Sequence, residues 1–70
     1  MRADYDEYED VLYLTLSPEP VEADDAHTSN GIIVRTLKGV PVGFTIIDVS
    51  EFLQISKEQL NVSFGGKKNL

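Results

Sequence analysis

Short runs of alternating apolar and polar residues run through most of this chain, and they predict a protein built mainly from β-strands. The clearest run spans residues 11–16. Alternate side chains of a strand point to the same side, so three leucines share one face: Leu12, Leu14 and Leu16. We expect that leucine face to belong to the core. Residues 2–6 are also extended in character, and the polar stretch between the two segments predicts a first hairpin.

The middle of the chain contains both a weak and a strong strand signal. Pro18 and Pro20 end the first long strand, because proline cannot donate a hydrogen bond to a sheet. The acidic residues that follow, over 21–28, predict either an edge strand guarded by charge or a loop. Asn30-Gly31 is typical of a turn, because both residues tolerate positive φ, and the β-branched run after it predicts a strand over 31–37.

The longest strand is expected over residues 42–49, after a chain reversal at 37–41. Alternation places three of its apolar residues on one face: Val42, Phe44 and Ile46. Gly43 lies inside this run. A glycine there indicates either a β-bulge or a position where another backbone or ring lies close.

The pattern becomes helical after this strand. Ser50 is a plausible N-cap for one helical turn over 50–53. Ser56 and Gln59 have the spacing of a capping box, which predicts a second short helical turn through Leu60. The alternating residues 60–64 fit either a last short strand or a docked irregular segment.

These elements predict an α+β fold, namely a mainly antiparallel sheet of four or five short strands with one or two short helical turns near residues 50–60. We expect one small domain over residues 1–64. The glycines and lysines of residues 65–70 predict a flexible C-terminal tail. A chain of 70 residues builds a small core that rarely supplies more than about 3–5 kcal/mol, so self-association, most simply a dimer, is expected.

Composition narrows the classes of function. The chain has no cysteine, so neither a disulfide nor a thiolate metal site can form, and it has a single histidine. The net charge is −6, which argues against a nucleic-acid partner because such binding relies on clustered Lys and Arg. No run of residues is long and apolar enough for a membrane span, and no secretory signal is recognisable at the N-terminus, so a cytoplasmic location without membrane contact is expected.

Charge is concentrated at the N-terminus, where residues 1–25 hold nine acidic side chains against Arg2 alone, a net of −8. Tyrosines lie among these acids, and tyrosine is enriched in protein interfaces, although packing of the rings in the core with the hydroxyl at the rim explains them equally well. A surface facing a basic protein partner is therefore predicted from six residues: Tyr5, Asp6, Tyr8, Glu9, Asp10 and Tyr13.

An alternative interpretation of the same acids is a metal-dependent or acid–base hydrolase. Its carboxylates would gather around one cation: Asp4, Asp6, Glu9 and Asp10. The glycine and glutamate positions of an EF-hand are not present at the required spacing. No phosphate-binding loop and no nucleophile motif occurs, and His27 is expected to be a surface histidine. No catalytic, cofactor-binding or metal-binding residue is assigned, and the chain is expected not to be an enzyme.

Several segments, in this order, are similar to a family of small bacterial proteins, the domain of unknown function 2283: Tyr5-Asp6, Asp10-Val11-Leu12-Tyr13-Leu14, Asn30-Gly31-Ile32-Ile33-Val34, Val42-Gly43-Phe44-Thr45-Ile46-Ile47-Asp48 and Ser50. The resemblance covers about residues 2–53. It departs at Arg35-Thr36, where the family commonly carries acidic residues, and at Thr45, where a glutamate is usual. It implies a compact antiparallel sheet with a short helical element, bacterial origin and no established activity. Some relatives are encoded beside small toxin-like proteins, so the resemblance also implies an antitoxin-like or regulatory role for this chain.

Together these observations favour a non-enzymatic interaction module that self-associates through an apolar sheet face and presents its acidic N-terminal hairpin to a partner. The alternative is an enzyme, namely a hydrolase whose site is the carboxylate cluster. A structural subunit of a larger assembly is a third.

Overall fold

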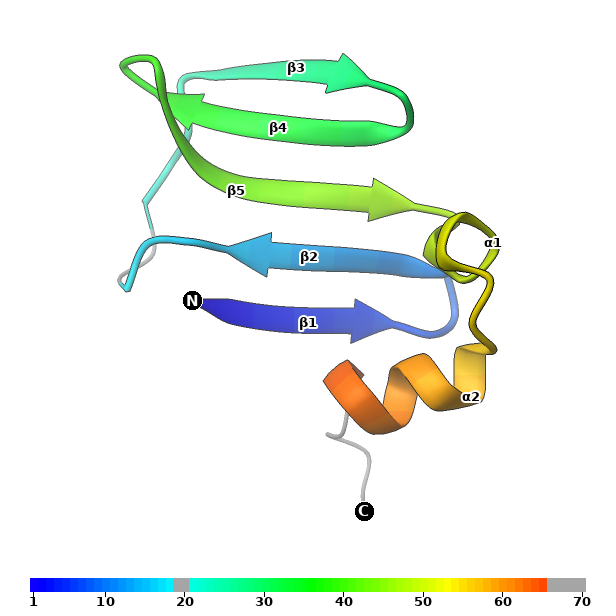
Figure 1. The fold of residues 1–70 in the computed structure, drawn as a ribbon. Helices are drawn as coiled ribbons and strands as arrows, with labels where there is room; N and C mark the ends of the chain where they lie inside the picture. The colour runs from blue at the N-terminus through cyan, green and yellow to red at the C-terminus, as the bar shows by residue number, and fades with distance from the viewer. Residues whose placement is uncertain (19–20, 66–70) are drawn as a thin grey trace.

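The computed structural model describes residues 1–18 and 21–65. Within them, the chain forms one antiparallel sheet followed by short helical segments, which confirms the predicted α+β class (Figure 1). The strands are β1 Arg2–Asp6, β2 Val11–Thr15, β3 Asp25–Ser29, β4 Ile32–Leu37 and β5 Val40–Ile47. The helical segments are α1 Val49–Leu53, α2 Lys57–Leu60 and the π-helical turn η1 Asn61–Gly65. Residues 66–70, most of the predicted flexible tail, lie outside the described residues.

The longest strand, β5, lies in the middle of the sheet, whose strand order is β1-β2-β5-β4-β3. The predicted first hairpin is confirmed, with Tyr5 of β1 opposite Leu12 of β2. β2 then pairs with β5, so that Leu14 lies opposite Phe44. Because cross-strand partners point to the same face, these pairs place apolar side chains from distant parts of the chain on one side of the sheet.

Two tight turns join the strands of the β3–β4–β5 half. Asn30 and Gly31 have φ values of 52° and 81°, and Lys38 and Gly39 repeat the same pair of values. Positive φ at both central residues gives a turn whose twist matches the right-handed twist of the strands. The turn predicted at Asn30-Gly31 is confirmed, as is a reversal within residues 37–41.

The weak acidic segment of the sequence contains an edge strand, β3, which begins at Asp25. All five of its residues are exposed. His27 Nε2 lies 3.8 Å from Asp25 Oδ2, and both side chains are 65% exposed, so His27 is a surface residue as expected. The charge of Asp25 on this edge disfavours pairing with another chain.

The central strand β5 begins at Val40 and ends at Ile47, so both ends lie two residues before the predicted ones. Arg35 pairs with Gly43, whereas Thr36 pairs with Pro41, so Val42 is an extra residue in β5. This is the β-bulge that the neighbouring glycine suggested. Pro41 is tolerated in the strand at this irregular position.

The first helical turn corrects one detail of the prediction. α1 begins at Val49 and its N-cap is Asp48, with φ 55° and no side-chain capping bond. Ser50 lies inside the helix instead of capping it, because its hydroxyl is used elsewhere, as described below. The second turn follows the prediction, since Ser56 Oγ accepts a hydrogen bond of 3.1 Å from the backbone N–H of Gln59.

The last apolar residues do not form a strand. They continue α2 into η1, and only Leu60 is buried, whereas Val62 is 79% exposed and Phe64 is 37% exposed. The helical conformation is preferred because it turns Leu60 toward the sheet while η1 lies along β1. The interpretation of residues 60–64 as a strand is therefore wrong.

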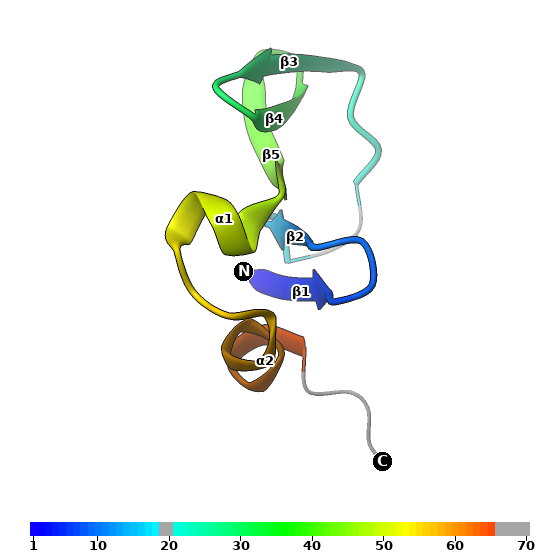
Figure 2. The ribbon, with the colours of Figure 1, turned by 90° about the vertical axis from the view of Figure 1, so that its right-hand side faces the viewer.

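A small core forms where the helical segments cover one end of the sheet. The buried cluster and the residues packed against it are Tyr5, Leu12, Val49 and Leu60, with Ala3, Leu14 and Ile46. Figure 2 shows α1 on one side of the sheet and α2 beside β1, with no helix over the β3–β4 end. The predicted leucine face is thus buried at Leu12 and only half-buried further along the strand. None of the helical segments in residues 1–18 and 21–65 has the length and apolar character of a membrane span.

Candidate functional site

A buried carboxylate, that of Asp10, links the first hairpin to the first helix. Asp10 is only 8% exposed and lies in the left-handed region with φ 60°. Its Oδ1 accepts a hydrogen bond of 2.7 Å from the hydroxyl of Tyr5. From α1, the backbone N–H of Ser50 donates to Oδ1 at 3.1 Å and the Ser50 hydroxyl donates to Oδ2 at 2.7 Å. Residues from β1, the hairpin turn and the helix are therefore held by one side chain.

The electrostatics of this cluster keep Asp10 ionised and Tyr5 protonated. Burial is the largest influence on the pKa of Asp10 and opposes ionisation, but the hydrogen bonds from Ser50 and Tyr5 together outweigh it, so the pKa lies below its ordinary value. Burial, with the hydrogen bond to Asp10 and its negative charge, raises the pKa of Tyr5 to about 12. A buried charge that accepts this many hydrogen bonds stabilises the fold.

This cluster corrects part of the predicted partner-facing surface. Tyr5 and Asp10 are buried, and a partner cannot contact their polar atoms without unfolding the hairpin. The reason is that Tyr5 lies on the covered face of β1 and Asp10 turns inward toward α1. Ser50, which sequence reasoning read as a helix cap, is the third member of the cluster.

The other four predicted partner-facing residues remain at the surface. Tyr8 is 94% exposed at the hairpin tip, and Tyr13 is 41% exposed on the face of β2 away from the helices. Glu9 is exposed, and its backbone N–H donates to Oδ1 of the half-buried Asp6 at 3.1 Å. Contact of these four residues with a partner stays a prediction.

The carboxylates proposed for a metal-dependent hydrolase do not converge. Asp10 is occupied by Tyr5 and Ser50, and Asp4 Oδ2 accepts a hydrogen bond of 2.9 Å from Arg2 Nε. In the part of the chain that the structure describes, no three His, Cys, Asp or Glu side chains are placed to share a metal ion. The hairpin acids are therefore not gathered around a common point in the described residues.

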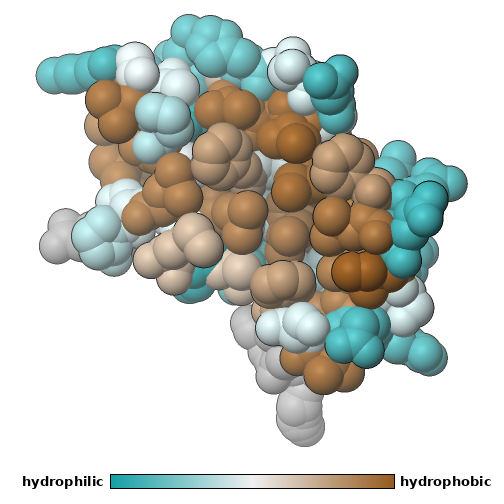
Figure 3. All heavy atoms as spheres, in the orientation of Figure 1, coloured by the Kyte–Doolittle hydropathy of each residue, from teal (hydrophilic) through white to brown (hydrophobic). Residues whose placement is uncertain are grey.

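An open apolar groove lies on the helix-bearing face of the sheet, beyond the end that the helices cover. It has a volume of about 430 Å³ and polar residues Ser29 and Asn30 at one end. Five half-buried apolar side chains from three strands form its floor: Leu14, Ile32, Val34, Phe44 and Ile46. Figure 3 shows the resulting hydrophobic surface across the middle of this face. We refer to these five residues as the apolar groove.

The groove carries no charge. β2, β4 and β5 place only apolar side chains on it, and the row next to it on β3 contains His27 and Ser29 opposite Val34 and Ile32. Phe44 and Ile46 line it as their shared face predicted, whereas Val42, the extra residue of the bulge, does not. The contribution of Ile32 and Val34 was not predicted, because the continuous apolar run of residues 32–34 does not show which face of the strand lines a groove.

Comparisons with known proteins identify the family of this chain but give no activity for it. A family model described as "Protein of unknown function (DUF2283)" matches residues 2–50 of the 70-residue chain. The match includes the hairpin, the sheet and the beginning of α1, so it contains Tyr5, Asp10 and Ser50. No curated protein and no solved structure matches the chain significantly.

Proposed function

The chain belongs to the DUF2283 family of proteins of unknown function, and from its surfaces we propose that it is a non-enzymatic protein-interaction module that pairs with a second copy of itself through the apolar groove. The observation that carries this proposal is the open, charge-free surface over β2, β5 and β4. Domains are built from at least two packed layers, because a sheet must bury its apolar face against something. Here the helical segments supply a second layer at one end only.

A second copy is the occupant that fits the groove best. A two-fold dimer brings the same patch of both copies together, so the patch must be complementary to itself. A surface without charge meets this requirement, since no like charges are brought together and no ion loses its water. Two sheets packed face to face lie about 10 Å apart, which suits interdigitating Val, Ile and Phe side chains.

The size of such an interface is compatible with this small chain. A standard interface covers roughly 800 Å² of each partner. The accessible surface of the chain is 4942 Å², so about one sixth of it would be covered. An interface on the face that bears the apolar groove would leave the opposite face and the hairpin tip free.

The free acidic tip then becomes the surface for a different partner. Glu7, Tyr8 and Glu9 are exposed at the turn between β1 and β2, next to Asp6. A basic protein would be steered to this end at low salt, and an antitoxin-like or regulatory role suits such charge complementarity.

The test is the molar mass in solution at several protein concentrations, by light scattering or sedimentation. The wild type should change from monomer to dimer as concentration rises. Val34→Asp puts an unpaired carboxylate into the interface, which costs several kcal/mol and should weaken the dimer by at least about a hundredfold. Val40→Asp is the matched control, because Val40 is 61% exposed and does not line the groove.

The effect of salt distinguishes the homodimer from a complex with a basic partner. Each copy carries a charge of −6, so added salt should screen the repulsion and strengthen the dimer, whereas a complex with a basic partner should weaken. Circular dichroism must give the same spectrum for both valine variants. A wild type that stays monomeric up to about millimolar concentration, which corresponds to no more than about 4 kcal/mol of association, would refute the proposal.

A further inference from the structure

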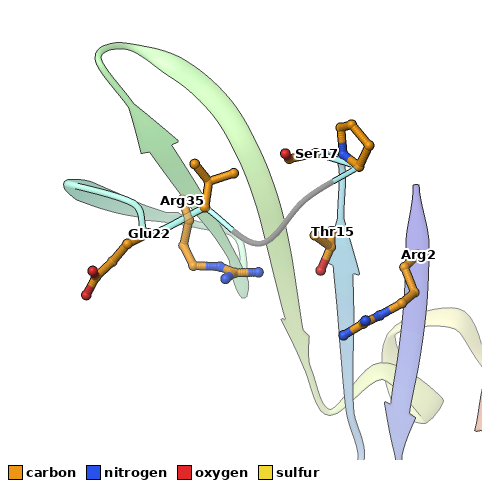
Figure 4. A pocket seen from close by; sticks show the side chains of 7 residues that line it. Arg2, Thr15, Ser17, Glu22 and Arg35 are labelled. Carbon is orange, nitrogen blue, oxygen red and sulfur yellow. The ribbon is translucent and has the colours of Figure 1, made fainter.

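The face of the sheet opposite the apolar groove has a pocket that neither the dimer nor the acidic tip uses. It lies beside the end of β2, has a volume of about 470 Å³, and brings together both arginines of the chain, Arg2 and Arg35. Figure 4 shows the two side chains extending over β2 and β5 toward one another, with Thr15 between them. Cations that converge in a protein of net charge −6 require a physical reason.

Strand register explains how the arginines meet. Arg2 of β1 pairs with Thr15 of β2, Thr15 pairs with Gly43 of β5, and Gly43 pairs with Arg35 of β4. The four residues therefore form one row across the sheet on the same face. Neighbouring strands lie about 4.8 Å apart, so the two arginines begin roughly 14 Å apart and extend inward from both ends.

Gly43 allows Arg35 to lie flat on the sheet. A Cβ at position 43 would contact Arg35 Nη2 and lie 2.9 Å from Arg35 Cζ and 3.0 Å from the carbonyl oxygen of Leu14. The sequence predicted that a backbone or a ring would lie close to Gly43, whereas the group nearest to it is a guanidinium. Its position holds the charge over β5, at the edge of the pocket, rather than in bulk water.

The guanidinium of Arg35 is not satisfied by its surroundings. Its Nε is buried and has no hydrogen-bond partner among the residues that the structure describes. A buried donor without an acceptor costs about 1–3 kcal/mol, and more when it is charged. Because this Nε has almost no accessible surface, an anion seated in the pocket would be bound by the outer Nη groups of the same guanidinium.

The remaining groups of the pocket are compatible with such an anion. Asp4 accepts a hydrogen bond from Nε of Arg2, which leaves the two Nη groups of that side chain for a ligand. Thr15 contributes a hydroxyl group between the arginines (Figure 4). Glu22 also lines the pocket, and its carboxylate points away from both guanidinium groups in Figure 4.

We propose that this pocket binds the phosphate group of a small anionic ligand, held by Arg2 and Arg35 with the Thr15 hydroxyl between them. Arginine presents a planar fork of donors that matches phosphate, and two such forks suit its double negative charge better than the single charge of a carboxylate. This inference goes beyond the proposed dimer, because the pocket lies on the other face of the sheet.

The experiment is a titration with inorganic phosphate at constant ionic strength, followed by amide chemical shifts and calorimetry. Phosphate should bind with a dissociation constant in the millimolar range and shift the amides of the row from Arg2 to Arg35. Acetate under the same conditions should bind at least about tenfold more weakly, since it lacks the second charge and the third oxygen.

Charge-matched variants identify the site. Arg35→Gln and Arg2→Gln should each weaken phosphate binding about tenfold or more, whereas Lys38→Gln, with the same loss of charge in the exposed β4–β5 turn, should stay within about twofold. Glu22→Gln should tighten binding. Gly43→Ala keeps every charge but displaces the guanidinium of Arg35, and it should weaken binding as well.

Several results would overturn the proposal. No saturable phosphate binding by the folded wild type would do so. Equal binding of phosphate and acetate, or an effect of Lys38→Gln as large as that of Arg35→Gln, would reveal attraction by general charge instead of a site. Val34→Asp, the dimer variant on the other face, should bind phosphate as the wild type does, so failure of the dimer and failure of the pocket are distinguishable.

Discussion

Replacing Asp10 by alanine should unfold the protein at 25 °C. The carboxylate accepts hydrogen bonds from the Tyr5 hydroxyl, the Ser50 backbone N–H and the Ser50 hydroxyl, at 2.7, 3.1 and 2.7 Å. Hydrogen bonds to a charged group contribute about 1.5–3 kcal/mol each, and alanine would leave the buried Tyr5 hydroxyl unpaired. Alanine is also unfavourable at φ 60°, by roughly 1–2 kcal/mol. The total of about 5 kcal/mol or more equals or exceeds the whole stability expected from so small a core.

Asp10→Asn separates the charge from the geometry. Asparagine tolerates the left-handed conformation, its oxygen can accept from Tyr5 and from the Ser50 N–H, and its amide can donate to the Ser50 hydroxyl. Only the contribution of the charge is lost, so we expect a decrease of about 1–2 kcal/mol in the free energy of unfolding. Tyr5→Phe and Ser50→Ala should each cost about as much, and their combinations with Asp10→Asn should be non-additive, because the three side chains contact one another.

The assay is urea unfolding followed by circular dichroism at one fixed protein concentration, because self-association makes stability depend on concentration. Asp4→Ala is the control, since Asp4 is in the same hairpin and its ion pair with Arg2 is at the surface, where such pairs contribute about 0–1 kcal/mol. If Asp10→Ala remains folded and loses less than about 2 kcal/mol, the cluster does not hold the hairpin to the helix.

Two pH dependences follow from the same cluster. The pKa of Asp10 is lowered from 3.8, so its stabilising effect is present above pH 3.8 and is lost as the pH falls through the folded-state pKa; the decline in unfolding free energy on acidification should be shallower in Asp10→Asn. The pKa of Tyr5 is raised from 10.0 to about 12, so its contribution is complete below pH 10 and is lost as the pH rises toward 12. Urea titrations from pH 9 to 12 should therefore give a steeper loss in the wild type than in Tyr5→Phe, and parallel curves would contradict the assignment.

Local patterns were sufficient to predict most of the sheet. Alternation over residues 11–16 and the turn residues Asn30-Gly31 depend only on neighbours in sequence, and strands and turns form at both places. The last segment differs because its conformation depends on tertiary packing. Leu60 is buried against Tyr5 and Leu12 in a helical conformation, while the alternation that suggested a strand leaves Val62 exposed.

The proposed interaction surfaces were predictable in part. The charge at the hairpin tip and the shared face of Phe44 and Ile46 are visible in the sequence, because both depend on local spacing. The role of Ser50 is not visible in the sequence, since its partner Asp10 precedes it by 40 residues. A serine near the start of a helix also has an ordinary local explanation as a cap. The approach of Arg35 to Arg2 depends on the register of four strands, which no local pattern contains.

The distribution of the core links the Asp10 cluster to the proposed dimer. Every fully or nearly buried apolar side chain among the described residues lies in β1, β2, α1 or α2, and the Asp10 cluster holds the β1–β2 hairpin to α1. β3 and β4 contribute none, and β4 exposes Ile32 and Val34 beside Phe44 of β5. Backbone hydrogen bonds alone do not compensate the entropy lost when these strands are ordered. A covering layer over the apolar groove would supply the missing burial, so the position where the core ends favours self-association as much as the apolar surface does.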